Sequence, residues 1–265
     1  MEKYNANLTG VSETLLIPLY ARALESKKTN HEFYDETAVK IVDSLDYDFE
    51  KFSKSNMNIW GCISRTIIFD NQVSNYIKKH PNCSVVNMAC GLDSRFSRVD
   101  NGKIIWYNID FDDVIKIRKN FIPDNDRVIN LSGSVLDDFW YDKIEDKNDV
   151  LIIAEGLLMY FEEEEVKKLF DKVAAACKNC TVMCELMSEW MVKNQKLHDV
   201  VKKTSAVYKW GVKNTDDFTK LCPQYRMVGE YNYTDTMKRF SPVFITLVSP
   251  MLRKRNNRLG CFEKI

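Results

Sequence analysis

The sequence predicts an α/β fold built around one mostly parallel, seven-stranded sheet whose last strand runs antiparallel. Beyond residue 80, apolar runs of strand length follow one another, and most are separated by segments of helical periodicity. The early runs are almost continuously apolar, which is typical of strands covered by helices on both faces. The last two runs, 225–231 and 243–248, are joined by a segment too short for a crossover helix, which predicts the antiparallel strand.

The first 80 residues are expected to be helical. Apolar residues recur at helical spacing from Leu15 to Leu24, again within 33–45, and in a third stretch after Gly61 that Pro81 ends. The expected strands then follow at 84–90, 104–110, 127–132, 149–154, 180–186, 225–231 and 243–248. The clearest helix between strands, 162–178, keeps its apolar side chains on one face and opens with glutamates, which stabilise a helix N-terminus.

The segment 188–223 is longer than a crossover requires. It is predicted to form a helical, lid-like insertion at the carboxyl edge of the sheet, where ligands bind in such folds. Its large side chains could line a substrate cavity or could pack the insertion onto the sheet; they are Trp190, Met191, Tyr208 and Trp210. The whole chain, 1–265, is expected to be a single domain, because a chain that is 45% hydrophobic can bury one core at this length.

Composition excludes several classes of protein. The 38 basic and 38 acidic residues cancel, so no strong field attracts nucleic acid or an anionic membrane. No apolar run reaches the roughly 18 residues of a membrane span, and no apolar signal segment opens the sequence. The cysteines are scattered, and Cys177 and Cys180 lack the second pair or spaced histidines of a zinc site. We therefore expect free thiols, a cytoplasmic location and no metal.

The segment 84–95 is the most informative part of the sequence. Its apolar run ends in a turn at Gly91, and a second apolar run ends 19 residues later at Asp110. A glycine lets the backbone approach a ligand, and an acid about 20 residues further on can accept hydrogen bonds from ribose hydroxyls. This spacing predicts a nucleotide or nucleoside site at the carboxyl ends of the strands.

The same turn discriminates between classes of nucleotide. It contains one glycine rather than the three of a dinucleotide fingerprint, and it carries Asp93 where phosphates would lie. An acid there favours S-adenosylmethionine, which has an adenosine and a sulfonium but no phosphate. The sequence thus favours a methyltransferase. A nicotinamide-dependent oxidoreductase and a non-catalytic S-adenosylmethionine-binding module remain the alternatives.

Two further strand ends extend this site. The third expected strand leads into the small polar loop 133–137, which could meet an adenine edge, and the fourth ends at Glu155. The carboxyl ends of parallel strands lie at one edge of the sheet. Glycine, acid, polar loop and acid on four successive strands would together form a nucleoside-shaped site.

With these motifs, the sequence resembles the family that unites leucine carboxyl methyltransferases with polyketide O-methyltransferases of the tetracenomycin type, and the polyketide branch more closely. The matching segments extend over most of the chain and are 8–15, 61–70, 89–96, 106–110 and 153–161. The resemblance implies a Rossmann-like class I S-adenosylmethionine-dependent methyltransferase. Its branches methylate different acceptors, so it does not choose one.

The resemblance also implies roles for single residues. Arg65 would hold the methionyl carboxylate of the cofactor, which suits a planar guanidinium, and Arg22 is the candidate for a second basic residue near the cofactor. Gly91 would line the methionine portion, and Asp110 would bind the ribose. The remaining cofactor residues would be Glu155 beside the amino-acid portion and the sulfonium, with Ser134, Val135 and Leu136 around the adenine.

The expected reaction is an O-methylation of a small-molecule hydroxyl or carboxyl with a polyketide-like character. A carboxylate acceptor is ionised at neutral pH and needs no base, whereas a phenol would gain from one. Tyr160 and His198 are the candidates for that catalytic role. The alternative acceptor is the C-terminal leucine carboxylate of a protein, and the sequence says nothing about the oligomeric state.

Overall fold

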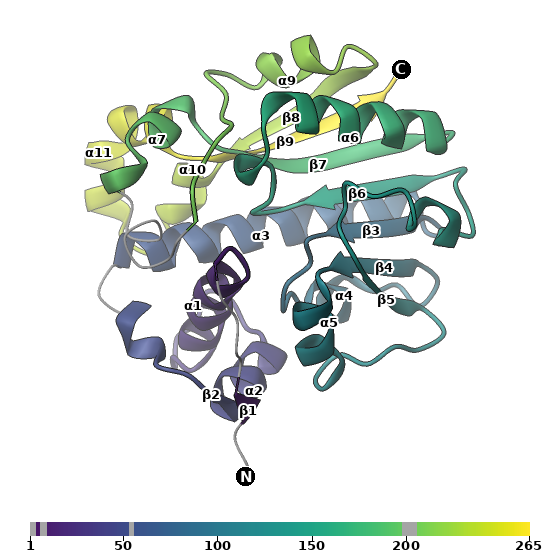
Figure 1. Cartoon of the computed structure of the whole chain (residues 1–265). Coiled ribbons are helices and arrows are strands. Elements are labelled where there is room, and N and C mark those ends of the chain that lie inside the picture. Colours follow the sequence, from purple (N-terminus) through teal and green to yellow (C-terminus); the bar gives the residue numbers. More distant parts are fainter. Residues whose placement is uncertain (1–3, 6–9, 53–55, 198–205) are drawn as a thin grey trace.

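The computed structural model describes residues 4–5, 10–52, 56–197 and 206–265. Its centre is a seven-stranded sheet in the order β5-β4-β3-β6-β7-β9-β8 (Figure 1). The strands are β3 (Ser84–Met88), β4 (Ile105–Asp110), β5 (Val128–Ser132), β6 (Val150–Ala154), β7 (Cys180–Leu186), β8 (Tyr225–Asn232) and β9 (Arg258–Lys264). Strands β3 to β7 pair in parallel, and β9 lies antiparallel between β7 and β8. This confirms the predicted α/β fold with its antiparallel last strand.

The identity of that last strand was predicted wrongly. Residues 243–248 form part of helix α11 (Pro242–Arg255), and the antiparallel strand is β9, which follows it. A short apolar run cannot by itself distinguish strand from helix. Pro242 stands in the first turn of α11, where its fixed φ angle favours a helix start. Strand β9 escaped notice because Gly260 and the charged residues near its ends interrupt its apolar pattern.

The helices expected at the N-terminus are present. They are α1 (Leu16–Ser26), α2 (Glu36–Ser44) and the long α3 (Asn56–Lys79), and the 3-10 turn η1 (Ser12–Leu15) precedes them. Asp35 caps α2 by accepting a hydrogen bond from the amide of Ala38. A two-stranded parallel pairing joins β1 (Tyr4–Asn5) to β2 (Leu45–Asp46). The remaining helices are α4 (Arg95–Val99), α5 (Asp112–Lys119), α6 (Glu163–Ala176), α7 (Glu189–Lys193), α9 (Asp216–Leu221) and α10 (Tyr233–Met237).

Helices cover both faces of the sheet. Neighbouring residues of a strand point to opposite faces, so Val85 packs with the α3 side and Val86 with the α6 side. The α3 face buries Ile68, Phe69, Val73 and Ile77. The α6 face buries Val166, Leu169, Phe170 and Val173. Burial on both faces explains the continuous apolar runs of the central strands.

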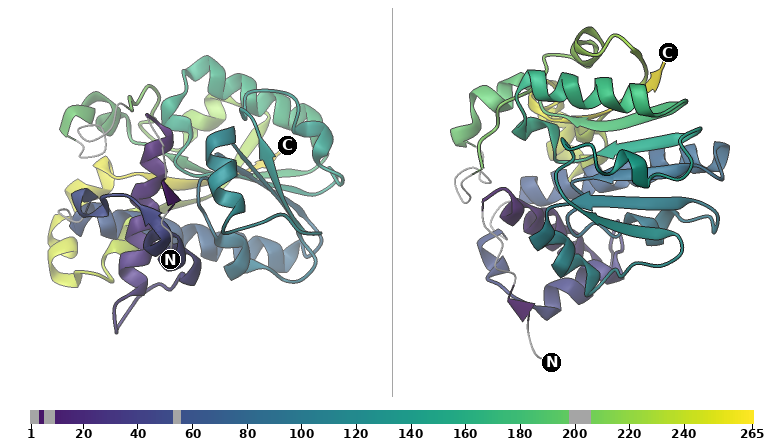
Figure 2. Two further views of the ribbon diagram at one scale, coloured as in Figure 1. Left: turned by 60° about the horizontal axis from the view of Figure 1, so that its bottom comes forward. Right: turned by 45° about the vertical axis from the view of Figure 1, so that its right-hand side comes forward.

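The segment 188–223 divides into two parts. Its first part contains α7, and Val212 returns beside Ser188 and exchanges backbone hydrogen bonds with Met187 and Glu189. Its last part, α9, lies over the sheet, where Phe218 packs against Phe262. Figure 1 shows α1, α2 and the first part of the insertion at one end of the strands, whereas α3 runs along a face of the sheet, as Figure 2 also shows. Within the described residues, no helix has the length and apolar character of a transmembrane span.

Candidate functional site

A cavity of about 530 Å³ lies at the carboxyl ends of the strands. Its walls come from η1, α1 and α3, from the loops after β3, β4, β5 and β6, from the end of β7, and from α7, α10 and α11. This is the edge at which open α/β sheets bind ligands, and the volume suits a small molecule. The cavity thus lies at the strand ends where the sequence analysis placed the site, and its identity as the functional site stays a prediction.

The turn after β3 brings the backbone close to the N-terminal segment. Gly91 has a φ angle of +50°, and a Cβ atom at this position would lie 3.3 Å from the Cβ of Leu15. Because an L-residue rarely adopts this conformation, glycine is required here. The amide of Gly91 donates a hydrogen bond of 2.7 Å to Oδ2 of Asp110. The 19-residue spacing thus reflects a direct contact between the ends of two adjacent strands.

Asp110 lines the cavity at the end of β4. Its second oxygen accepts a hydrogen bond of 2.8 Å from the amide of Phe111. Burial raises the pKa of this carboxyl above its ordinary value, although the backbone hydrogen bonds and Arg118 oppose the shift. Two backbone hydrogen bonds thus fix the carboxylate at the cavity wall, and its ribose-binding role stays a prediction.

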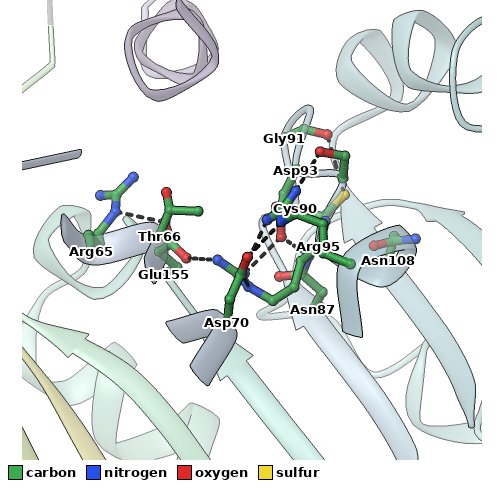
Figure 3. Close-up of polar contacts among 12 residues, drawn as sticks. Arg65, Thr66, Asp70, Asn87, Cys90, Gly91, Asp93, Arg95, Asn108 and Glu155 are labelled. Atoms are coloured by element: carbon green, nitrogen blue, oxygen red, sulfur yellow. Dashed lines mark hydrogen bonds and ion pairs between the residues drawn. The ribbon is translucent and has the colours of Figure 1, made fainter. Parts of the chain in front are cut away.

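Arg95 is the centre of a buried ion-pair network beside the turn (Figure 3). Its guanidinium lies 2.7 Å from Asp70, 2.8 Å from Asp93 and 2.7 Å from Glu155. Arg98 adds ion pairs to the same Asp70 and Asp93. Arg95 is only 1% exposed, so water screens the charges of its ion pairs very little.

The network gives the Asp93 carboxylate two arginine partners. Although burial opposes ionisation, Arg95 and Arg98 hold the pKa of this carboxyl well below its ordinary value. Its charge is paired with these guanidiniums rather than free. The discrimination against a dinucleotide therefore rests first on the single glycine of the turn.

Arg65 reaches the cavity from α3. Its Nε lies 2.7 Å from Oε1 of Glu155, and its Nη1 donates a hydrogen bond of 2.8 Å to Oε2 of Glu185. Burial alone would lower the pKa of Arg65, but the two carboxylates outweigh it and raise the pKa above its ordinary value. Arg65 and Glu155, which the sequence analysis named separately, thus belong to one ion-pair cluster.

Glu185 was missed by the sequence analysis. It is 2% exposed in β7 and also accepts hydrogen bonds from the amide of Gly156 at 2.9 Å and from Nδ2 of Asn257 at 2.8 Å. The available signal was a lone acid within an otherwise apolar strand, since a buried charge requires partners. These partners come from three other parts of the chain.

The other predicted cofactor residues are only partly gathered at the cavity. Arg22 lines it and donates hydrogen bonds to Asp35 at 2.9 Å and to the carbonyl of Leu92 at 2.8 Å. Ser134 and Val135 line it as well. Leu136 instead packs against the core of the α6 face. The candidate base His198 lies outside the described residues.

The wall beyond Glu185 is apolar and rich in thioethers. Its side chains are Met159, Tyr160, Met187, Met191, Tyr208, Met237 and Leu252. Two aromatics expected here have other surroundings: Trp190 lies under the guanidinium of Arg255 at 4.5 Å, and Trp210 is buried in the core with its Nε1 donating to Glu163. Of the two alternatives that the sequence left open for these side chains, Trp210 thus follows the packing one, whereas Met191 and Tyr208 line the cavity.

Tyr160 stands in this wall with its hydroxyl 3.4 Å from Oγ1 of Thr14. Burial raises the pKa of Tyr160, so its phenol stays protonated at neutral pH. A protonated phenol can donate a hydrogen bond but cannot accept a proton as a base. The direction of this shift favours hydrogen bonding over proton abstraction, and the catalytic role of Tyr160 stays a prediction. Among the described residues, no group of three or more His, Cys, Asp or Glu side chains is arranged to hold a metal ion.

The sequence of the chain is similar to those of known methyltransferases. The family model of the leucine carboxyl methyltransferases matches residues 16–174. The tetracenomycin polyketide synthesis O-methyltransferase TcmP of Streptomyces glaucescens is 29% identical over 230 residues, which cover 86% of this chain and 85% of TcmP. The S-adenosyl-L-methionine-dependent methyltransferase dpfgK of Gibberella zeae is 27% identical over 190 residues, which cover 65% of this chain and 63% of dpfgK.

Solved structures share the fold at low sequence identity. A candidate methyltransferase from Thermobifida fusca superposes with a TM-score of 0.62 at 12% identity, covering 94% of each chain. The magnesium protoporphyrin IX methyltransferase ChlM of Synechocystis, solved with bound SAH, superposes with a TM-score of 0.54 at 10% identity, covering 82% of this chain and 94% of ChlM. These similarities establish a class I methyltransferase fold.

Proposed function

From the premise that the chain belongs to the leucine carboxyl methyltransferase family, we propose that it is an O-methyltransferase that transfers the methyl group of S-adenosylmethionine to a small, largely apolar molecule. The acceptor group is a hydroxyl or a carboxyl. The observation that carries this choice of acceptor is the wall of methionine, tyrosine and leucine side chains beyond Glu185.

The residues of the cavity fit the cofactor. The Gly91 turn brings the backbone to the cavity wall beside Leu15, with no Cβ atom between them, and Asp110 offers a fixed carboxylate for ribose hydroxyls. Arg65 and Glu155 form a pair of opposite charges that matches the carboxylate and ammonium of an amino acid. When bound, the cofactor supplies a methyl group on a cationic sulfur, and the neutral thioether that remains after transfer is a good leaving group.

The apolar wall favours flat or greasy acceptors. Methionine side chains adapt to irregular shapes and make favourable sulfur contacts with aromatic rings. Tyr160 and Tyr208 add aromatic surface, with their ring centroids 5.7 Å apart. Asn256 and Asn257 add polar groups to the cavity, but this wall itself consists of thioether, aromatic and leucine side chains, so an aromatic, polyketide-like molecule suits it better than a protein C-terminus.

The protein's part in the reaction is chiefly positioning. Holding the acceptor oxygen in line with the methyl group and excluding water can contribute about 7–11 kcal/mol. Tyr160, as a protonated phenol, would orient the acceptor oxygen by donating a hydrogen bond to it. A phenolic acceptor would also need a proton acceptor, for which His198 remains the candidate.

The free thiols support a cytoplasmic location. All eight cysteines are unpaired, and most are buried. Reduced cysteines are typical of proteins that work in a reducing compartment.

A panel of acceptors tests the proposal. The purified chain is incubated with S-adenosylmethionine and, separately, with hydroxyanthraquinones, aromatic carboxylic acids and a peptide ending in leucine. Methyl transfer is followed by mass spectrometry. Transfer to the aromatic acceptors is expected. Transfer to the leucine carboxylate alone would overturn the choice of acceptor but not the methyltransferase activity.

A further inference from the structure

The ion pairs described above belong to one continuous network in the part of the chain that the structure describes. Its N–O distances lie between 2.6 and 3.6 Å, and no member exposes more than 15% of its side chain. The pairs are Arg22–Asp35, Arg98–Asp35, Arg98–Asp70, Arg98–Asp93, Arg95–Asp70, Arg95–Asp93, Arg95–Glu155, Arg65–Glu155 and Arg65–Glu185.

The network does not balance its own charge. Four guanidiniums face five carboxylates, which leaves one negative charge in excess. Asp110 and Arg118 lie beside the same turn and add one charge of each sign, so the excess is unchanged. The network forms one side of the cavity through Arg22, Arg65, Arg95, Asp93, Glu155 and Glu185. Each carboxylate has at least one arginine partner, so the excess belongs to the network as a whole, and a cation in the cavity would compensate it.

We propose that this excess negative charge makes the site select the cationic methyl donor over the neutral product, and that Glu185 supplies it. The inference rests on the proposed function. S-adenosylmethionine carries a sulfonium, an ammonium and a carboxylate, so its net charge is +1. Its product, S-adenosylhomocysteine, has a neutral thioether and a net charge of zero. A site with one excess carboxylate therefore complements the donor and loses that complement after transfer.

Methyl transfer removes the positive charge from the cofactor. The carbon–sulfur bond breaks and its electron pair stays on sulfur, which becomes neutral, while a carbon–oxygen bond forms to the acceptor. A hydroxyl acceptor releases its proton, and an ionised carboxyl acceptor becomes a neutral ester. With a hydroxyl acceptor the positive charge leaves as that proton, which passes to solvent, and with a carboxylate acceptor it is cancelled by the acceptor's own negative charge. In both cases the cofactor product that remains is neutral, which favours its release.

Glu185 is the member of the network whose charge can be removed with least disturbance. It pairs with one arginine, Arg65, and its other partners, Gly156 and Asn257, are uncharged hydrogen-bond donors. A glutamine at this position keeps an oxygen acceptor and leaves four guanidiniums facing four carboxylates. An aspartate keeps the charge but shortens the side chain.

Calorimetric titration tests the proposal without an acceptor. The probes are S-adenosylhomocysteine and sinefungin, a stable analogue in which a carbon bearing an ammonium replaces the sulfonium. Wild type is expected to bind sinefungin about tenfold more tightly than S-adenosylhomocysteine, as one partly screened charge pair predicts. Glu185→Gln should bring the two affinities within about twofold, whereas Glu185→Asp should keep the preference. Glu164→Gln, which removes an exposed acid of α6, is the matched control and should match wild type.

The outcomes are distinguishable. A wild type that binds both ligands equally, or the neutral one more tightly, overturns the proposal, and this result stands even if the glutamine variant fails to fold. Equal losses of both affinities in Glu185→Gln also overturn it, because they would mean that Glu185 only positions Arg65. A wild type that binds neither ligand would instead contradict the proposed function.

Discussion

Arg95→Met tests the energetic role of the ion-pair network. Arg95 is fully buried and pairs with three carboxylates, so its removal leaves Asp70, Asp93 and Glu155 undercompensated. Removing one partner of a buried ion pair costs about 3–5 kcal/mol. Each of the three carboxylates keeps a second arginine, Arg98 or Arg65, so we expect the lower part of that range, about 3–4 kcal/mol.

The expected loss is measurable as a melting temperature. For a chain of this size, 1 kcal/mol shifts the midpoint by about 2 °C, so Arg95→Met should melt about 6–8 °C below wild type at pH 7. Arg127→Met is the matched control, because Arg127 forms a well-made pair with Asp100 that is partly exposed. Exposed pairs contribute about 0–1 kcal/mol, so the control should lose no more than about 2 °C.

The loss of stability in Arg95→Met should also depend on pH. In wild type the arginines lower the pKa of Asp93 and of Glu155. That stabilisation is complete above the ordinary carboxyl pKa near 4 and disappears as pH falls through the lowered values. Without Arg95 the same carboxyls protonate at a higher pH than in wild type, so the difference in stability between Arg95→Met and wild type should be constant from pH 7 to about pH 5 and should narrow as the pH falls below that. A pH-independent difference no larger than that of the control would refute the reasoning.

Three substitutions test single roles in the site. Arg65→Lys keeps the charge but loses the planar guanidinium, so it should weaken S-adenosylhomocysteine binding several-fold. Methylthioadenosine lacks the amino-acid portion, so its binding should hardly change. Equal losses of both affinities by calorimetry would point to a general effect on the site. Asp110→Asn should weaken S-adenosylhomocysteine binding by about tenfold, through loss of a charge-assisted hydrogen bond, and an unchanged affinity in the folded variant would exclude the ribose role. Tyr160→Phe should leave the shape of the pH–rate profile unchanged, because burial raises the pKa of this phenol and keeps it protonated; loss of an ionisation from the profile would restore Tyr160 as a base.

The central part of the site could be predicted from sequence because it depends on local patterns. Apolar runs define the parallel strands, and their carboxyl ends meet at one edge, so Gly91, Asp110 and Glu155 had to lie near one another. The contact of 2.7 Å between the Gly91 amide and the Asp110 carboxylate follows from that topology. Arg65 required the family resemblance, since nothing in its own segment indicates a partner.

The remaining features depend on tertiary contacts that no local pattern encodes. Glu185 is positioned by groups from the loop after β6, from α3 and from Asn257 just before β9, all distant from it in sequence. Trp190 faces Arg255 of α11, a helix that was itself expected to be a strand. The helical state of 243–248 follows from packing at Ile245, which is buried beside exposed Val243 and Leu247, rather than from its composition.

The most direct test of the cofactor assignment is a calorimetric titration of the wild-type protein with S-adenosylhomocysteine and, in parallel, with NAD. The single glycine of the turn, the fixed carboxylate of Asp110 and the paired charges of Arg65 and Glu155 predict saturable binding of S-adenosylhomocysteine at one site per chain and no binding of NAD. Binding of NAD without binding of S-adenosylhomocysteine would contradict the account.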